Sequence, residues 1–143
     1  MRSLDTNILL YSLNADCQEF GAARQLVQDL ASADDVLICD LVLVELYLLL
    51  RNPEVLTRPL SAKEAVETCL TFRNNPRWRV VEGAAIMNSV WPLAAHNKFP
   101  RRRIIDARLA LTLRHHGVTE WITRNIADFQ SYGFTRVWHP FRV

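Results

Sequence analysis

Residues 36–53 read VLICDLVLVELYLLLRNP, and this stretch decides how the rest of the chain is interpreted. A short apolar run, Val36 to Cys39, is a candidate strand. Leu41 to Leu50 is almost wholly apolar, follows Asp40 as an N-cap residue and stops before Pro53, which predicts a buried helix. A strand that passes directly into a helix is the repeating unit of a parallel sheet covered by helices.

The same alternation of strand and helix runs through the whole chain. Further strands are expected around Leu4 and at 79–81, 118–123 and 136–138, and further helices at 19–31, 61–72, 83–97 and 104–115, with a short turn or helix at 126–131. Ser61 and Glu64 match a capping box, and Gly117 is placed to end a helix. We therefore predict an α/β fold, a three-layer α/β/α sandwich with a central, mostly parallel sheet of four to five strands.

Length and composition limit the number of domains and the class of protein that the chain can be. A length of 143 residues, with 50% hydrophobic and 22% charged residues, predicts one globular domain over 1–143. Three widely spaced cysteines, none in a C-x-x-C pair, indicate neither a disulfide framework nor a zinc site. The N-terminus does not resemble a signal peptide, and the apolar run at 41–50 is too short to span a bilayer. We expect a cytoplasmic protein with no membrane partner.

Three carboxylates are placed where the fold would bring them together. Asp5 ends the first strand, Glu45 is the only charged residue in its apolar helix, and Asp106 lies in the first turn of a later helix. Taken singly, each has an ordinary explanation: a helix cap for Asp5, a buried salt bridge or an edge position that reaches water for Glu45, and an interaction with the helix dipole for Asp106.

Helix geometry separates Asp106 from its neighbours. A turn of about 100° per residue puts Arg108, Thr112 and His115 on one polar face and directs Asp106 away from it. Asn125 and Asp128 follow the strand at 118–123, where Thr123 and Asn125 could also cap a turn.

The joint pattern favours a metal site. In a doubly wound sheet these side chains can converge outside the carboxyl ends of the strands. Carboxylates brought together repel unless a cation lies among them, and oxygen ligands without His or Cys suit Mg²⁺ or Mn²⁺. One or two such ions could activate water for phosphodiester hydrolysis.

Four motifs in order resemble those of the PIN-domain ribonucleases, and among them the VapC-like toxins of toxin–antitoxin pairs. They are LDTNILLYSL, VLVELYLLLRNP, RRRIIDARLALTLRHHGV and WITRNIADFQSYGF, and the ending VWHPF is similar as well. The resemblance covers essentially the whole chain. It implies a metal-dependent endoribonuclease with an RNA substrate, a cognate antitoxin that covers the acidic groove, and a homodimer.

The resemblance also implies roles for individual residues. Asp5, Glu45 and Asp106 would be the core metal-binding acids, and either Asn125 or Asp128 would complete the catalytic site. The residues expected to orient the acids are Thr6, Asn7 and Thr123. Contiguous arginines support RNA binding independently, and the candidate contacts are Arg101, Arg102, Arg103 and Arg108.

Alternatives remain at this point. A phosphoaspartate hydrolase would want an Asp where Asn7 stands and a late Lys, whereas Lys98 is the last in the chain. A PIN-like module that binds RNA or antitoxin with little or no cutting is the non-enzymatic alternative, because Asn125 replaces an acid found in some relatives. A housekeeping RNA-processing nuclease is the alternative to a toxin.

Overall fold

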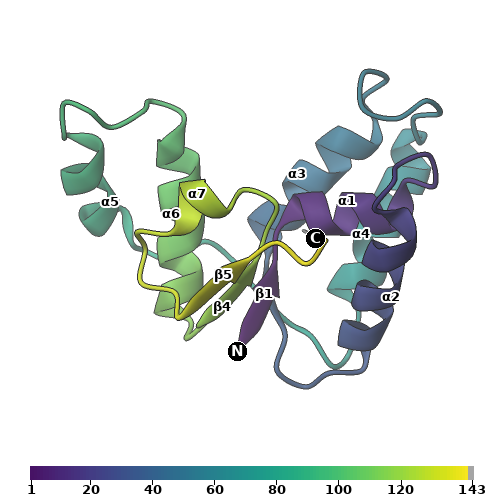
Figure 1. Cartoon of the computed structure of the whole chain (residues 1–143), viewed down its shortest axis with the longest axis horizontal. Helices are drawn as coiled ribbons and strands as arrows, with labels where there is room; N and C mark the ends of the chain where they lie inside the picture. The colour runs from purple at the N-terminus through teal and green to yellow at the C-terminus, as the bar shows by residue number, and fades with distance from the viewer. Residues whose placement is uncertain (142–143) are drawn as a thin grey trace.

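The chain folds as alternating strands and helices around one sheet (Figure 1). The structure is a computed structural model and describes residues 1–141. Its elements are β1 (Arg2–Leu4), α1 (Thr6–Leu13), α2 (Phe20–Ala31), β2 (Leu37–Cys39), α3 (Asp40–Leu50), α4 (Ala62–Arg73), β3 (Arg79–Val81), α5 (Met87–Ala94), α6 (Arg103–His115), β4 (Glu120–Ile122), α7 (Ile126–Phe129) and β5 (Arg136–Trp138).

The strands form a parallel sheet in the order β3-β2-β1-β4-β5. Parallel ladders join β2 to β3, β1 to β4 and β4 to β5. The two halves meet through a parallel bridge between Arg2 and Val36, beside a hydrogen bond of 2.8 Å from Arg2 N to Asp35 O. All the described pairings are parallel, so the carboxyl ends of β1, β2 and β4 lie at one edge of the sheet.

Helices cover the sheet on both sides. Figure 1 shows α1 to α4 on one side of β1, and α5, α6 and α7 on the other side, next to β4 and β5. The predicted three-layer α/β/α architecture with five strands is therefore confirmed. Among residues 1–141, no helix has both the length and the apolar character needed to cross a membrane.

The core lies between these layers. All three residues of β2 are fully buried, as are Leu4 and Trp121 on the two strands that carry the site. Each large apolar side chain removed from water in this way stabilises the fold by roughly 1.5–3 kcal/mol before entropy is counted. The predicted capping box is formed: Ser61 and Glu64 bond each other's backbone N–H at 3.2 and 3.0 Å.

Several expectations differ from the structure in detail. Helix α1 was not expected as a separate element, and α5 is shorter than the predicted 83–97. Helix α3 begins at Asp40, so that Cys39 and not Asp40 is its N-cap residue. Its burial was overestimated, because Val44 and Leu48 are 57% and 61% exposed.

One assignment on α6 was wrong. Thr112 does not share a solvent face with Arg108 and His115: it is fully buried, whereas the other two are exposed. Thr112 is buried even though its Oγ1 has no hydrogen-bond partner among residues 1–141, so residue polarity was a poor guide to its direction.

Candidate functional site

Asp5 stands at the carboxyl end of β1 and is also the N-cap residue of α1. Its backbone is extended, which ends the strand, while its carboxylate accepts hydrogen bonds from Thr6 N at 2.7 Å and from Thr123 Oγ1 at 2.7 Å. The Asn7 side-chain amide lies 3.4 Å from the same carboxylate. Only 6% of Asp5 is exposed. The two explanations considered for Asp5, a cap and a ligand, are therefore compatible.

The environment of Asp5 opposes its ionisation. Burial raises the pKa of Asp5 from 3.8 to about 6, although the hydrogen bonds from Thr123 and Thr6 act in the opposite direction. The negative charges of Glu45 and Asp106 raise the pKa further. Asp5 is therefore within electrostatic reach of both other acids that the sequence singled out.

Glu45 approaches Asp5 from α3, the helix that follows β2. Thr6 Oγ1 lies 3.0 Å from Val42 O and 3.3 Å from Glu45 Oε2, so that Thr6 touches both acids, through its backbone N–H and its hydroxyl. Glu45 is exposed and, within residues 1–141, forms no salt bridge. The buried ion pair considered for Glu45 is therefore absent from the described part of the chain.

Asp106 lies in the first turn of α6 and is half-buried. Burial raises the pKa of Asp106, and the charges of Asp128 and Glu45 raise it further, while the Arg103 guanidinium lowers it. Asp106 is less exposed than Arg108 on the same helix, but the polar stripe from which it was predicted to turn away does not include Thr112.

The segment after β4 closes the site. Thr123 is fully buried, donates to Asp5 and accepts a hydrogen bond of 3.0 Å from Asn125 N. Asn7 Oδ1 accepts a hydrogen bond of 3.2 Å from Arg124 N. These bonds tie the 123–125 turn to β1 and α1.

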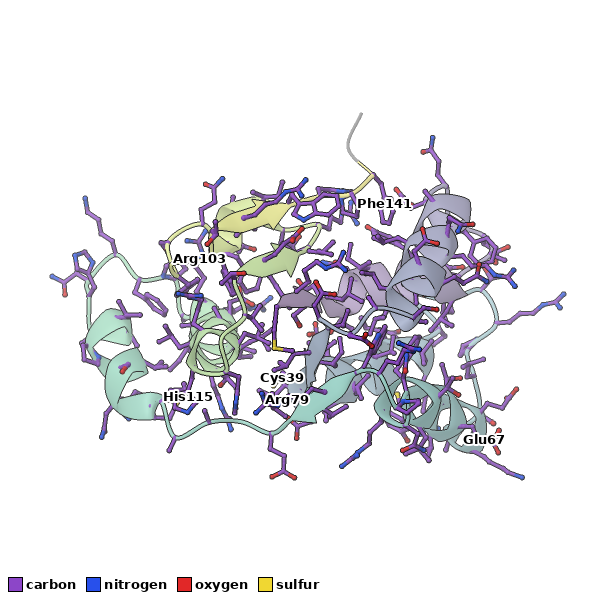
Figure 2. All side chains as sticks on the ribbon, turned by 90° about the horizontal axis from the view of Figure 1, so that it is seen from below. Cys39, Glu67, Arg79, Arg103, His115 and Phe141 are labelled. Carbon is purple, nitrogen blue, oxygen red and sulfur yellow. The ribbon has the colours of Figure 1, made fainter. Side chains whose placement is uncertain are left out.

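Asp128 and Asn125 have different surroundings. Asp128 Oδ1 accepts a hydrogen bond of 3.0 Å from the Arg103 guanidinium, and its charge acts on the pKa of Asp106. Asn125 is exposed, and its backbone N–H donates a hydrogen bond to the Thr123 hydroxyl. Figure 2 shows Arg103 at the start of α6, the helix that also carries Asp106. The sequence did not predict this ion pair, because it joins residues 25 positions apart.

The acids are close enough to repel one another but are not drawn together as a formed metal site. Within residues 1–141 no group of three or more His, Cys, Asp or Glu side chains is spaced to hold a metal ion. The donor set nevertheless fits one: it consists of carboxylate oxygens, and the charges of Asp106 and Glu45 keep the pKa of Asp5 raised.

Of the four arginines proposed for RNA binding, three are exposed and one is held in an ion pair. Arg101 and Arg102 are exposed, whereas Arg103 is held by Asp128. Arg108 is exposed, and its guanidinium lies against Gly83, where an added Cβ would come within 3.2 Å of it. Sequence reasoning also passed over an aromatic group beside the site, formed by Tyr11, His139 and Phe141.

Comparison with known proteins decides the family. The family model described as "PIN domain" matches residues 3–134, which is nearly the entire chain. The chain belongs to the PIN-domain family. Two of the most similar curated relatives of this PIN-domain chain come from Mycobacterium tuberculosis. Ribonuclease VapC24 is 59% identical over 140 residues, covering 98% of this chain and 97% of the relative, and Ribonuclease VapC48 is 33% identical over 94 residues, covering 63% and 62%.

Solved structures agree with the PIN-domain fold. VapC20 of M. tuberculosis, described as a sarcin-ricin loop cleaving toxin, superposes with a TM-score of 0.69 at 20% identity and covers 94% of this chain and 96% of its own. FitAcB of Neisseria gonorrhoeae gives 0.68 at 20% identity, and a toxin–antitoxin complex from Klebsiella pneumoniae gives 0.61 at 22%, each over 100% of both chains. At these identities the likeness shows the fold alone.

Proposed function

We propose that this PIN-domain protein is a metal-dependent endoribonuclease and the toxin of a toxin–antitoxin pair. The observation that carries the proposal is Asp5, a buried carboxylate held by Thr6 and Thr123 and facing two further acids. The prediction of a ribonuclease is confirmed by the near full-length relative that bears that name at 59% identity. VapC24 is also the relative that supports the toxin assignment.

The acids Asp5, Glu45 and Asp106, with Asp128, would hold one or two divalent ions, which we propose to be Mg²⁺ or Mn²⁺. A bound ion of this class supplies a nucleophilic water and neutralises charge on the phosphodiester. Burial, reinforced by the charges of Glu45 and Asp106, raises the pKa of Asp5 to about 6, so that near and below this pH a proton competes with metal for that carboxylate. Metal binding therefore releases protons from the site.

The remaining residues position these acids. Thr6 and Thr123 each donate a hydrogen bond to a different oxygen of Asp5. The lone pairs that these bonds leave free can face the other carboxylates. Thr6 also lies against Glu45, which sets the spacing between β1 and α3. Arg103 pairs with Asp128 and lowers the pKa of Asp106, so that in the metal-free protein it offsets part of the negative charge of these acids.

We assign the fourth ligand position to Asp128 and not to Asn125. The charge of Asp128 raises the pKa of Asp106, and on binding a metal Asp128 would exchange its ion pair with Arg103 for the cation. The exposed Asn125 is left for contact with substrate. The test is a metal titration of Asp128→Asn and Asn125→Ala, in which we expect the first substitution to weaken Mn²⁺ binding about tenfold and the second to leave it unchanged. The reverse order would move the ligand role to Asn125.

The partners follow from the assignment to this family. We propose RNA as the substrate and a cognate antitoxin as the inhibitor. The known toxin–antitoxin complexes among the structural neighbours support the second partner. We also propose a homodimer, for which the exposed apolar side chains of α3 and α4 provide a surface.

RNA cleavage tests the proposed activity directly. Wild-type protein is compared with Asp5→Asn and Asp106→Asn in Mg²⁺ or Mn²⁺, with and without chelator, and Asp16→Asn is the matched control in the exposed loop after α1. We expect both site variants to lose at least 10²-fold in rate and the control to retain it. Cleavage that survives both site substitutions would favour a module that binds without cutting.

A separate measurement distinguishes a toxin from a housekeeping nuclease. Induction in a bacterial host is expected to arrest growth with wild-type protein but not with Asp5→Asn, and co-expression of the neighbouring antitoxin is expected to restore growth. Arrest by neither protein would favour a housekeeping role.

A further inference from the structure

A pocket of about 640 Å³ opens beside the acids, between the 124–128 segment and the residues His139 and Phe141 that follow β5. We call it the 124–128 pocket. The proposed cleavage mechanism uses Asp128 of its lining as a metal ligand and leaves Arg124, His139 and Phe141 without a role. Its size is that of a small-ligand cleft.

One wall of the 124–128 pocket is aromatic. The Phe141 ring packs edge-to-face on His139, with ring centroids 5.8 Å apart at 87°, and on Tyr11 at 6.0 Å and 75°. Figure 2 shows Phe141 near the end of the chain, beyond β5. His139 Nδ1 accepts a hydrogen bond of 3.1 Å from Phe141 N, which fixes the imidazole and leaves Nε2–H as a donor without an acceptor among residues 1–141. The wall is therefore held in place by its own contacts.

The 124–128 segment contributes a cation and an amide to the pocket. The Arg124 guanidinium lies 5.8 Å from the Tyr11 ring centroid, so that it is held near the aromatic wall while remaining exposed. Asn125 is exposed beside it. A guanidinium can pair with a phosphate, and an amide can donate to and accept from the edge of a base.

The pocket is joined to the acids by two hydrogen bonds in series. Arg124 N donates to Asn7 Oδ1, and the Asn7 amide lies 3.4 Å from Asp5 Oδ2. A group bound in the pocket is therefore next to the carboxylates and not at a remote surface. The acids themselves repel a polyanion, so a neighbouring cation is needed to hold a phosphate near them.

We propose that the 124–128 pocket binds one unpaired nucleotide adjacent to the scissile phosphodiester of the RNA. The base stacks on the Phe141 and His139 wall, Arg124 contacts the flanking phosphate, and Asn125 contacts the base edge. The inference rests on the proposed ribonuclease function and adds to it the residues that select the base. Stacking tolerates every base, so Asn125 and His139 Nε2–H supply the preference.

The test of the wall is Phe141→Leu, which keeps an apolar side chain against Tyr11 but removes the ring. Trp91→Leu is the matched control, because it removes an exposed ring, 56% accessible, from α5. Single-stranded RNA oligonucleotides that vary only at the bases flanking the cleaved bond are cut, and the 5′ ends of the products are mapped. We expect Phe141→Leu to raise KM about tenfold and Asn125→Ala to flatten the base preference, with the control unchanged.

A binding measurement makes the result independent of catalysis. Asp5→Asn protein, alone or combined with Phe141→Leu, Arg124→Gln or Trp91→Leu, is titrated with a labelled single-stranded RNA in chelator, and anisotropy is read. We expect about tenfold weaker binding for the Phe141 and Arg124 combinations and no change for the Trp91 combination.

The outcomes separate the two proposals. If the wild-type protein binds RNA through Phe141 but does not cut it, the proposed nuclease activity is contradicted and the proposed role of the pocket is supported. Cleavage with unchanged KM, base preference and affinity in the Phe141, Asn125 and Arg124 variants supports the nuclease and overturns the pocket. Loss of antitoxin binding in Phe141→Leu with RNA binding intact also overturns it and assigns the pocket to the protein partner.

Discussion

Asp5 shows how one residue can serve the fold and oppose it. Its carboxylate caps α1 and receives the Thr123 hydroxyl, but burial and the nearby acids raise its pKa to about 6. At neutral pH the folded protein therefore carries an ionised group in an environment that disfavours ionisation. Sites arranged for a ligand are often destabilising in its absence.

Asp5→Asn is expected to make the metal-free protein more stable at pH 7.5. The folded-state pKa of Asp5 lies above 3.8, so its stabilising effect is fully present below that pH and is lost as pH rises through about 6. Asn keeps one oxygen for the Thr6 N–H hydrogen bond and places an NH2 group where Asp5 accepts from Thr123, so the Thr123 hydroxyl must accept instead of donate, but Asn cannot ionise. The expected gain is about 1–3 kcal/mol.

Thermal unfolding in chelator at pH 4 and at pH 7.5 measures this effect. The gain should vanish at the lower pH, where Asp5 is largely protonated, and the exposed control Asp16→Asn should show no such dependence. A variant less stable than wild type at pH 7.5 would contradict the account.

Thr123→Val is expected to shift the pH dependence of cleavage upward by about one unit. The Thr123 hydroxyl lowers the pKa of Asp5 through a hydrogen bond of 2.7 Å, so its removal leaves the carboxylate harder to ionise and to load with metal. Thr123→Ser restores the hydroxyl and should restore the profile. A loss of rate at all pH values without a shift would indicate a structural role alone.

At the scale of elements, the strand and helix order was predictable because it depends on local patterns. Alternating apolar runs with capping and stop residues gave β2 and α3, and the capping box at Ser61 placed the start of α4. Local patterns could not show which side chains of a helix face the rest of the fold. Thr112 is buried and Val44 exposed because the neighbouring helices, and not residue polarity, decide which face is covered.

The candidate site was predictable to the same extent. Asp5, Glu45 and Asp106, with Asn125 and Asp128, were expected to converge because ligands in a parallel sheet bind outside the carboxyl ends of the strands, whereas the role of Thr123 came from the family resemblance. The contacts that distinguish Asp128 from Asn125 depend on Arg103, which no local pattern connects to them. The 124–128 pocket could not be predicted for the same reason, because it forms only where Phe141 packs against the distant Tyr11.

The link between α6 and α7 gives a prediction at this scale. Arg103→Gln is expected to tighten Mn²⁺ binding at pH 8 by several-fold, because it frees Asp128 and removes a positive charge near the acids. Arg102→Gln removes an equal charge from an exposed neighbour. Calorimetric titration should show the larger effect for Arg103. Equal effects would mean that general charge, and not the ion pair, controls the site.

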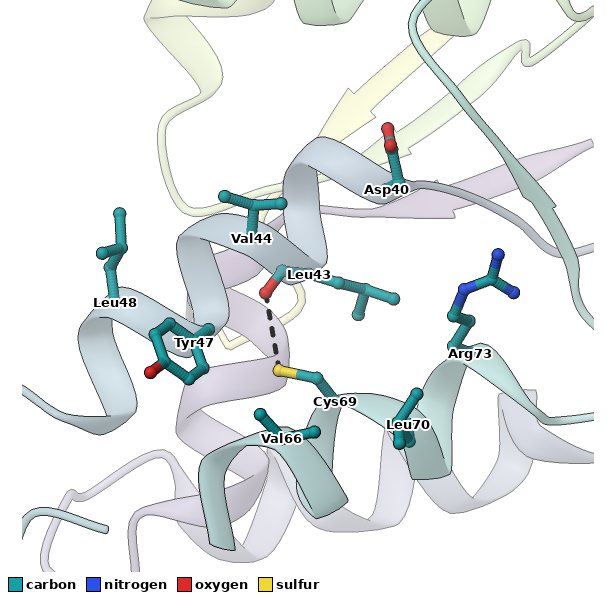
Figure 3. A pocket seen from close by; sticks show the side chains of 9 residues that line it. All are labelled: Asp40, Leu43, Val44, Tyr47, Leu48, Val66, Cys69, Leu70 and Arg73. Carbon is teal, nitrogen blue, oxygen red and sulfur yellow. Dashed lines mark hydrogen bonds between the residues drawn. The ribbon is translucent and has the colours of Figure 1, made fainter. Parts of the chain in front are cut away.

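At the scale of the whole molecule, α3 presents two faces with different roles. One face carries Glu45 toward Asp5, and the other forms an apolar groove of about 310 Å³ with α4. Figure 3 shows Cys69 pointing from α4 toward α3, with its Sγ 3.5 Å from Leu43 O. Apolar side chains on both helices remain 43–61% exposed, namely Val44, Leu48, Val66 and Leu70.

Leu48→Glu is expected to shift the proposed homodimer toward monomer. An exposed apolar patch of this kind usually marks an interface. A glutamate buried in that interface without a partner would strongly disfavour association. Leu93→Glu on α5 is the matched control, with a leucine that is 41% exposed. Sedimentation velocity over a range of concentrations measures the effect. Both variants should remain folded by circular dichroism, and only Leu48→Glu should raise the dissociation constant, by at least tenfold. Equal self-association of the two variants would place the dimer contact elsewhere on the molecule.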